Sequence, residues 1–541
     1  MKKLFTFILG MGAMLCANAQ NPFAYGLTSG TPVSPSEGLI TADVTYSLNA
    51  DADEVKALIM NENGEVVKTL ALEGIKKGEY ETTLDLSGIG MGDFTWAIEV
   101  KGGATSGNPV NFTTWSFYHP CGLDVDNSTE SPSFGTIFVA EGYFPSSGVT
   151  DSRKGYISLP TSNGSVSDAS GLYMFTPTFE SIKGEDGYAR FYPSFLTHSH
   201  KYSTSSSAGA DFSKVAVADD GRIFVSRHNN LGDYILVAES VESLKNGGEF
   251  TSLLSGKTMT DATIYNDANG NFLAGPTQAM DVKGGGEDTK ILVIARNANS
   301  TSYSYSINRA KEYNVGNGVT LETANSYPVL DGKFTISYDR GINVAYDNRG
   351  GVWYCQYRGT PTDAQPALVY VDANGIQKYF EGAGGKARNK AAMAVSPDGT
   401  RLAASRDFIS KSQNYMAIYD IAYAEDGTPT LTEACSIKFT FTSTNDNLMS
   451  ATWDCAGNLY LGNATKEWVK GYAVPRANNV FATKAPSKYS LVIDSTVSID
   501  GIDTDADAPV EYYNLQGVKV ENPEKGIFIK RQGSKTTKVV L

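Results

Sequence analysis

The sequence has few of the residues that enzymes use most often for chemistry. Its 541 residues include only four histidines, His119, His198, His200 and His228. It contains no H-E-x-x-H pair, nucleophile elbow, phosphate loop or dinucleotide fingerprint. His198 and His200 would share a strand face, but the segment around them is rich in serine and carries no acidic cluster. We therefore predict neither a metal site nor a cofactor, and we favour a noncatalytic protein.

Positive charge is also scarce. The chain has 45 Lys and Arg against 59 Asp and Glu, which gives a formal net charge of −14, and charged residues make up only 19% of it. An acidic balance of this kind argues against a general role on nucleic acid or on anionic membranes. Beyond the first 15 residues no apolar run is long enough to cross a bilayer. We expect no nucleic-acid partner and no membrane span.

Residues 1–19 have the pattern of a secretory signal. Two lysines are followed by an apolar stretch to Leu15, and Ala17-Asn18-Ala19 provides the small residues of a cleavage site. Cys16 raises the alternative of a lipoprotein signal, but the two residues before it are bulky rather than small. We predict a secreted protein or one displayed on the outer cell surface, with the periplasm as the alternative location.

Cysteine is rare in the rest of the chain, where it occurs at Cys121, Cys355, Cys435 and Cys455. Export permits disulfides, and four cysteines allow three pairings. Buried free thiols packed within sheets are the alternative, and the sequence does not choose between them.

The residues that are abundant favour β-structure. The chain has 54 Gly, 30 Tyr and 24 Phe and lacks long amphipathic helical patterns. Its length requires two or more domains. One phrase recurs, consisting of an apolar run, a turn rich in Asp, Asn and Gly, and a second apolar run that ends in a polar residue. The copies span residues 214–227, 280–296, 343–358, 392–406 and 450–463, with a shorter copy at 134–141.

This repeat predicts a β-propeller over residues 121–497. The polar residues that end the copies are 48 to 86 residues apart, and a four-stranded blade needs about 40–50 residues plus any inserted loops. We predict six blades, with a seventh in the long first interval as the alternative. The phrases resemble those of NHL-type and lactonase-like propellers, a resemblance that implies the fold and not the ligand.

We predict a β-sandwich over residues 20–120, because short strand patterns alternate there with turn residues. The segment resembles the Ig-like domain of flagellar hook-capping proteins. The matching residues are Val55–Ile59, the Asn63–Val67 turn, Gly78–Tyr80, Leu84–Leu86 and Gly92–Phe94, although Leu84 stands where that family has a tryptophan. The resemblance implies a spacer or adhesive module.

The C-terminal part predicts an acidic linker at residues 498–510 and a small β module of three short strands at residues 511–541. The module resembles the C-terminal sorting domains of Bacteroidota proteins that use type IX-like export. The resemblance rests on Tyr513–Gly517, Gly526–Ile529 and the basic and apolar ending Lys535–Leu541. It implies the export machinery as a partner and display or release at the cell surface.

A propeller brings equivalent positions of its blades together around one axis. The residues that end the second strands should therefore form a ring at one face, near the mouth of the channel. With His228, which follows one of them, the predicted ligand-binding residues are Glu141, Arg227, His228, Arg296, Arg358, Arg406 and Asn463. Four of these are arginines, whose guanidinium groups suit the oxygens of carboxylate, sulfate or phosphate. The alternative is that each arginine pairs with an acidic residue of the adjacent blade.

We therefore predict noncatalytic binding of a glycan, including an anionic one, or of a protein at this face. Aromatic and polar residues that would complete a carbohydrate surface are Asn229, Tyr346, Trp353 and Trp453, although both tryptophans fit strand cores better. The alternative function is a carbohydrate-active lyase or hydrolase that uses Glu141 with a neighbouring basic residue. Asp219, Asp220, Asp398 and Asp454 lie in the repeated turn, where we expect a structural role.

Overall fold

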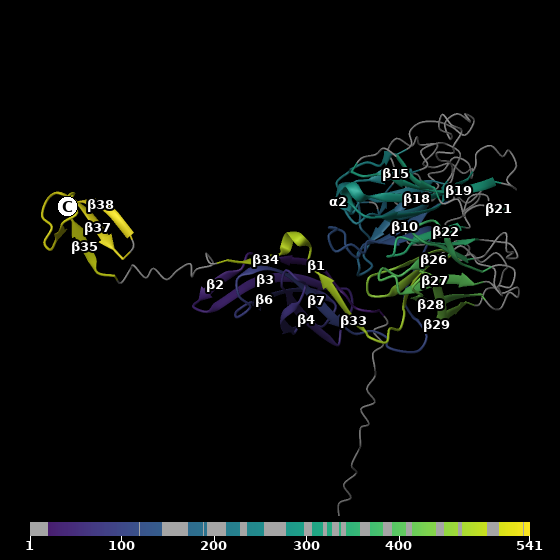
Figure 1. Ribbon diagram of the computed structural model, residues 1–541, viewed down its shortest axis with the longest axis horizontal. Helices are drawn as coiled ribbons and strands as arrows, with labels where there is room; N and C mark the ends of the chain where they lie inside the picture. The colour runs from purple at the N-terminus through teal and green to yellow at the C-terminus, as the bar shows by residue number, and fades with distance from the viewer. Residues whose placement is uncertain are drawn as a thin grey trace, which may run out of the picture.

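The computed structural model consists of two interlocked β domains and a separate C-terminal sheet (Figure 1). It describes residues 20–117, 120–142, 171–187, 189–191, 212–227, 235–253, 277–296, 306–317, 322–326, 335–336, 342–356, 368–381, 392–406, 414–439, 448–463, 468–494, 508–533 and 535–541. The predicted signal at residues 1–19 and most of the predicted acidic linker lie outside this description.

The sandwich has two antiparallel sheets. In the first, the order is β1-β3-β2 with β6 paired to β3, and the strands are β1 (Ala24–Ser29), β2 (Val33–Ser36), β3 (Leu39–Leu48) and β6 (Gly78–Asp85). In the second, the order is β33-β7-β4-β5 with β34 paired to β7, and the strands are β4 (Glu54–Met60), β5 (Val66–Leu72), β7 (Gly92–Lys101), β33 (Val480–Lys484) and β34 (Leu491–Ile493).

Alternation along the strands creates the sandwich core. In β4 the buried positions are Val55, Ala57 and Ile59, and the intervening side chains are only half-buried. Trp96 of β7 is fully buried in the same core, where its indole N–H donates to the carbonyl of Tyr489 at 3.0 Å. This pattern is the one expected when each sheet buries one face.

The propeller consists, among the described residues, of six sheets with four or five strands each. The first two sheets consist of β9 (Pro120–Val125), β10 (Ile137–Glu141), β11 (Gly171–Phe175) and β12 (Arg190–Phe191), and of β13 (Phe212–Val217), β14 (Ile223–Arg227), β15 (Ile235–Ala238) and β16 (Thr251–Ser252). The third and fourth consist of β17 (Thr277–Lys283), β18 (Lys290–Arg296), β19 (Ser306–Asn314), β20 (Glu322–Ser326) and β21 (Thr335–Ile336), and of β22 (Ile342–Tyr346), β23 (Val352–Gln356), β24 (Leu368–Val371) and β25 (Gln377–Glu381). The fifth and sixth consist of β26 (Met393–Val395), β27 (Arg401–Arg406), β28 (Asn414–Tyr423) and β29 (Pro429–Phe439), and of β30 (Leu448–Trp453), β31 (Asn458–Asn463), β32 (Trp468–Ala473) and β8 (Val110–Ser116). Short helices are α2 (Val241–Lys245), η2 (Gly286–Asp288) and η3 (Ser487–Tyr489).

The six sheets form a closed ring. Each first strand contacts the first strand of the next sheet, and β30 of the last sheet contacts β9 of the first. Six hydrophobic clusters fill the spaces between consecutive sheets, including the space between the last sheet and the first. In one of them Trp353 and Tyr370 pack against Met393 and Leu402 of the following sheet. The predicted β-propeller is therefore present.

Two boundaries of the predicted domains are wrong. The sequence places β8 in the sandwich, but β8 pairs with β32 as the outermost strand of the last propeller sheet. It places β33 and β34 in the propeller, but both pair with β7 of the sandwich. A local strand pattern does not reveal its partner, and these partners are several hundred residues away in the sequence.

The repeated turn connects the first and second strands, and its aspartates are structural as predicted. Asp454 accepts hydrogen bonds from the backbone N–H groups of Ala456 at 3.0 Å and Asn458 at 2.8 Å. Gly457 completes this turn with a φ of +80°, a conformation that glycine adopts without steric cost. Burial raises the pKa of Asp454 to about 6.

The C-terminal sheet has four strands rather than the predicted three. They are β35 (Val510–Tyr513), β36 (Lys519–Val520), β37 (Ile527–Gln532) and β38 (Lys535–Val540), in the order β36-β35-β37-β38. β36 pairs with β35 across the turn that contains Gly517. Elsewhere, all four cysteines named above are free thiols, three of them buried.

Asn21 and Asn458 join the sandwich to the last propeller sheet. The side-chain carbonyl of Asn458 accepts from the Asn21 backbone N–H at 2.7 Å, and its amide donates to the Asn21 carbonyl at 3.0 Å and to the Asp454 carboxylate at 2.7 Å. Both asparagines are buried, so none of these groups has water as a substitute partner.

Replacing Asn458 with alanine should therefore destabilise the protein by about 2–4 kcal/mol, because it removes three hydrogen bonds within a buried network. Chemical denaturation of the full chain measures the effect. Asn63→Ala, at an exposed hairpin turn, is the matched control and should stay within about 0.5 kcal/mol of wild type. Equal stability of the two variants would contradict a stabilising role for this junction.

Candidate functional site

The second strands end where the sequence predicts. Glu141, Arg227, Arg296, Arg406 and Asn463 are the last residues of β10, β14, β18, β27 and β31. These positions are equivalent in five sheets, and they lie at the end of each sheet where the first strand begins. Arg358 and His228 lie outside the described residues, as does Asn229. The structure thus describes five of the six predicted strand-end positions, and a role of this set in ligand binding stays a prediction.

Three of these side chains are enclosed by the protein. Glu141, Arg227 and Asn463 are at most 1% exposed. Glu141 sits opposite Gly171 of the third strand and Asn463 sits opposite Trp468, so each lies within its sheet. Burial of charged and polar groups at equivalent positions indicates that they support the end of the ring from within.

Arg406 pairs with an acidic residue of the adjacent sheet, which was the alternative to ligand binding. Its guanidinium forms a two-fold ion pair with the Glu381 carboxylate, with one contact at 2.5 Å, and its Nε donates to the hydroxyl of Tyr419 at 2.9 Å. Glu381 ends β25, the outermost strand of the preceding sheet, and also accepts from the hydroxyl of Tyr379 at 3.1 Å. Arg406 thus forms an ion pair with Glu381 of the preceding sheet, and we remove Arg406 from the predicted ligand-binding residues.

The aromatic residues proposed for a carbohydrate surface also contact other parts of the propeller. Trp353 and Trp453 are at most 2% exposed and pack between sheets, as the sequence favoured. The hydroxyl of Tyr346 donates to Glu312 at 2.8 Å, and the ammonium group of Lys283 lies 4.1 Å from the centre of its ring. These three residues stabilise the propeller, and we do not assign them to a ligand.

The first strands of all six sheets line a central channel that contains a cavity of about 100 Å³. Ligand pockets usually have about 300–1,000 Å³, so this cavity is too small for a sugar ring with its contacts. It corresponds to the volume of about three water molecules. This cavity therefore offers less volume than a typical ligand site.

Lys214 crosses this channel. It is 3% exposed, and its ammonium group donates to the carbonyl oxygens of Cys121 and Met449, each at 3.1 Å. These carbonyls belong to the first strands of the first and last sheets, so one side chain from the second sheet ties both together. Burial lowers the pKa of Lys214 to about 8.

Two carboxylates make similar connections deeper in the channel. Asp124 accepts from the backbone N–H of Val217 in the next sheet at 2.8 Å and from the hydroxyl of Thr452 in the last sheet at 3.3 Å. Asp281 accepts from the backbone N–H of Tyr346 in the next sheet at 2.7 Å. Burial, with a further contribution from the charge of Asp281, raises the pKa of Asp124 to about 8, and burial raises the pKa of Asp281 to about 6.

Sequence reasoning missed these channel residues. Each is a single polar residue inside the apolar first run of a repeat, as in Leu123-Asp124-Val125 and Met280-Asp281-Val282. The signal was present, because a charged residue in a strand that is buried on both faces needs a specific partner. The arrangement joins neighbouring sheets and gives the channel a polar interior.

Asp124 also generates a pH dependence. Because its folded pKa lies above the ordinary value, the folded protein holds a proton between about pH 4 and pH 8 that the unfolded chain releases. Stability must therefore fall as the pH rises through this window, with a slope of up to about 1.4 kcal/mol per pH unit from this group. Asp124→Asn should lose less stability than wild type between pH 5 and pH 8.

Urea denaturation at several pH values within the window measures this difference. Asp93→Asn, at an exposed position of the sandwich, is the control and should follow the wild-type slope. The same slope in wild type and Asp124→Asn would contradict a protonated Asp124 in the channel.

Comparison with known proteins identifies part of the chain. Residues 30–106 match the FlgD Ig-like domain, which agrees with the predicted hook-capping resemblance and is consistent with an extracytoplasmic protein. No curated protein matches the chain. Within the described residues, no helix has the length and apolar character needed to cross a membrane.

The chain also shows weak likeness to several solved structures. Streptogramin B lyase has a TM-score of 0.33 and 11% identity, over 68% of this chain and 96% of that one. TolB from Acinetobacter baumannii has a TM-score of 0.27 and 11% identity, over 85% and 83%. Hydrazine synthase from Kuenenia stuttgartiensis has a TM-score of 0.33 and 11% identity, over 66% and 77%. Likenesses of this size carry no functional argument. The chain is an all-β protein with an FlgD-type Ig-like domain and a β-propeller.

Proposed function

We propose that this chain is an exported, noncatalytic binding protein whose propeller recognises a glycan or a protein at the face where the second strands end. The observation that carries this proposal is the common position of the second-strand ends. In five sheets the second strand ends at this face, with Glu141, Arg227, Arg296, Arg406 and Asn463 as the last residues. The first strands of the sheets surround one axis, so these equivalent positions surround it too. Three of the five are arginines, whose guanidinium groups suit anionic ligands.

The small channel supports a ligand that lies across this face. A ligand bound here would contact arginines at or next to the second-strand ends and would leave the channel interior to its structural role. Arg296 and Arg358 are the arginines we propose for it, because Arg406 is committed to Glu381 and Arg227 is buried. Guanidinium groups favour an anionic sugar or an acidic protein surface.

Export and display complete the proposal. Residues 1–19 would direct the chain out of the cytoplasm, and the C-terminal sheet would contact the export machinery. This sheet exposes apolar side chains that a partner would cover, including Leu515 at 62% and Val540 at 75% exposure. The proposed location is therefore the outer cell surface or the medium.

A glycan array tests the proposed face. Arg296→Ala and Arg358→Ala should each weaken binding about tenfold or more, because each removes a charge-assisted contact. Arg476→Ala is the matched control, since Arg476 pairs with Asp398 in a turn at the opposite face and should leave binding unchanged. Full binding by both test variants would exclude this face as the site.

The alternative function makes a different prediction in the same assay. A lyase or hydrolase would convert a bound glycan into unsaturated or shortened products, and Glu141→Gln would abolish them. Intact glycans after long incubation with the wild-type protein would support the noncatalytic proposal.

A further inference from the structure

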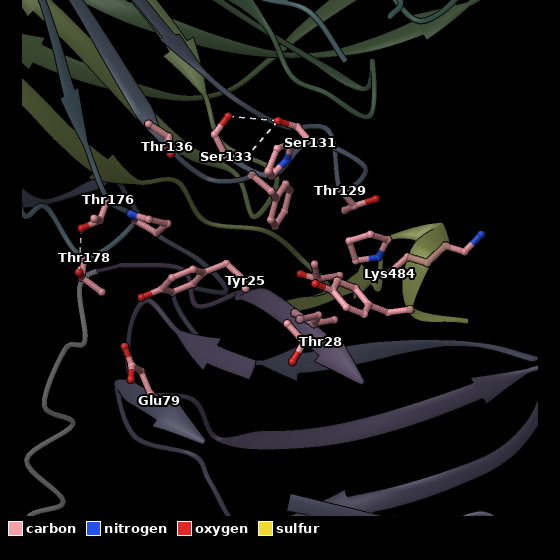
Figure 2. Close-up of a pocket in the computed structure, with 18 of the residues that line it drawn as sticks. Tyr25, Thr28, Glu79, Thr129, Ser131, Ser133, Thr136, Thr176, Thr178 and Lys484 are labelled. Carbon is pink, nitrogen blue, oxygen red and sulfur yellow. Dashed lines mark hydrogen bonds between the residues drawn. The ribbon is translucent and has the colours of Figure 1, made fainter. Parts of the chain in front are cut away.

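A second cleft lies between the sandwich and the first propeller sheet, away from the proposed binding face (Figure 2). Its volume is about 730 Å³. One wall comes from β1 and the start of β6, and the other comes from the connection between β9 and β10 and the turn that follows β11. The segment after the propeller, residues 483–489, closes one end.

We propose that this cleft binds a short neutral oligosaccharide, as a site separate from the propeller face. The volume lies within the range of about 300–1,000 Å³ typical of ligand sites, and such sites occur preferentially between domains. The cleft is more than seven times larger than the channel cavity.

The lining has the two chemical features that sugars require. Tyr25, Phe134 and Tyr489 provide aromatic rings, on which the C–H faces of a sugar stack. Threonine hydroxyls come from separate segments. They include Thr28 of β1, which shares a hydrogen bond with Thr45 at 2.5 Å, and Thr178 of the turn after β11, which shares one with Thr176 at 2.9 Å. Hydroxyl groups donate and accept, which matches the hydroxyl groups of a sugar.

Tyr25 occupies the middle of the cleft. Figure 2 shows its ring between Glu79 on the sandwich side and Thr176 and Thr178 on the propeller side. Tyr25 is half-buried, and its phenol interacts with the side-chain hydroxyls of Thr178 on the propeller side and Ser47 on the sandwich side. A ring held between two domains can stack with a ligand that both domains contact.

The charges of the lining favour a neutral ligand over a strongly charged one. Lys77, Glu79 and Glu180 belong to the walls, and Lys484 and Lys488 belong to the closing segment. Acidic and basic groups nearly balance, so no single sign of ligand charge is selected. The same groups can hydrogen-bond to sugar hydroxyls.

The walls are fixed before any ligand binds. Ser487 donates to the Glu130 carboxylate from its backbone N–H at 3.0 Å and from its hydroxyl at 2.7 Å. Thr483 donates to the carbonyl of Ala24 at 2.7 Å, and Ser29 donates to the carbonyl of Tyr489 at 2.9 Å. These bonds connect the closing segment to both domains. A preformed site loses less conformational entropy when it binds.

The turn that carries Thr178 is held in an unusual conformation. Phe179 has a φ of +73°, the only positive value of a non-glycine residue in the described part of the chain. Such a conformation costs about 1–3 kcal/mol for a bulky residue and persists where the surroundings impose it. Here the Phe179 ring packs against Phe112 and Trp115 at 5.5 and 5.2 Å between ring centroids. This packing fixes Thr178 and Glu180 on either side at the cleft.

An extended peptide fits the cleft less well. β1 is an edge strand, and a peptide would have to add to it as a new strand. However, its pairing with β3 is irregular between Tyr25 and Thr28, where Gly26 has a φ of +64°. The carbonyl of Ala24 is already used by Thr483. An interrupted edge resists strand addition, whereas a sugar uses the side chains alone.

The test compares glycan-array profiles of the full-length protein and its variants. Tyr25→Ala should abolish, or weaken about tenfold or more, the binding of at least one neutral oligosaccharide that Arg296→Ala and Arg358→Ala still bind. Thr178→Val preserves the size of the side chain and removes one hydroxyl. It should weaken binding of the same glycan by about threefold to tenfold. Tyr512→Ala in the C-terminal sheet is the control and should leave the profile unchanged.

The outcomes separate this site from the propeller face. Glycans whose binding is lost only in the arginine variants belong to the propeller face. The cleft proposal would be overturned if Tyr25→Ala and Thr178→Val both bound the same glycans as wild type. The absence of any bound neutral glycan would also overturn it. A peptide library whose binding depends on Tyr25, with no such glycan, would replace it by peptide recognition. Unfolding temperatures near wild type confirm that the variants are folded.

Discussion

The strand that closes the propeller is the constraint on which the rest of the structure depends. β8 precedes the first sheet in the sequence, yet it pairs along its length with β32 of the last sheet. Without it, the last sheet would expose an unpaired edge, and the ring would have a weak joint. The same closure forces the chain to return to its starting point, so the segment that leaves the propeller reaches the sandwich and adds β33 and β34 to it. Each domain therefore contains strands from the sequence region that flanks the other domain.

This interlocking determines where ligands can bind. It places the sandwich beside the first propeller sheet and creates a cleft whose walls come from both domains. The sandwich meets the propeller at the connection between the first and second strands of the first sheet, and the second strands end at the opposite face. The centre of the ring has a different role. Lys214, Asp124 and Asp281 form hydrogen bonds with backbone groups of neighbouring sheets, so the channel residues are part of the framework.

Much of the fold could be predicted because the repeat encodes it locally. The apolar runs specify strands, the Asp and Gly residues specify the turn, and the phase between them fixes which residues end the second strands. Partners are not encoded locally. The sequence of β8 suits a sandwich strand as well as a propeller strand, and only the geometry of ring closure selects its partner. For the same reason the pairing of Arg406 with Glu381 was left as an alternative, since it depends on how two sheets pack. The cleft was not predictable because its lining comes from five separate segments with no common motif.

Hydrogen exchange of the native protein tests most directly whether β8 belongs to the propeller. The amides of β8 should be protected to the same degree as those of β32, and under mild denaturant both strands should open in one step, separately from β4 and β5 of the sandwich. Rapid exchange of β8, or opening together with the sandwich strands while β32 stays protected, would contradict the closure of the ring by this strand.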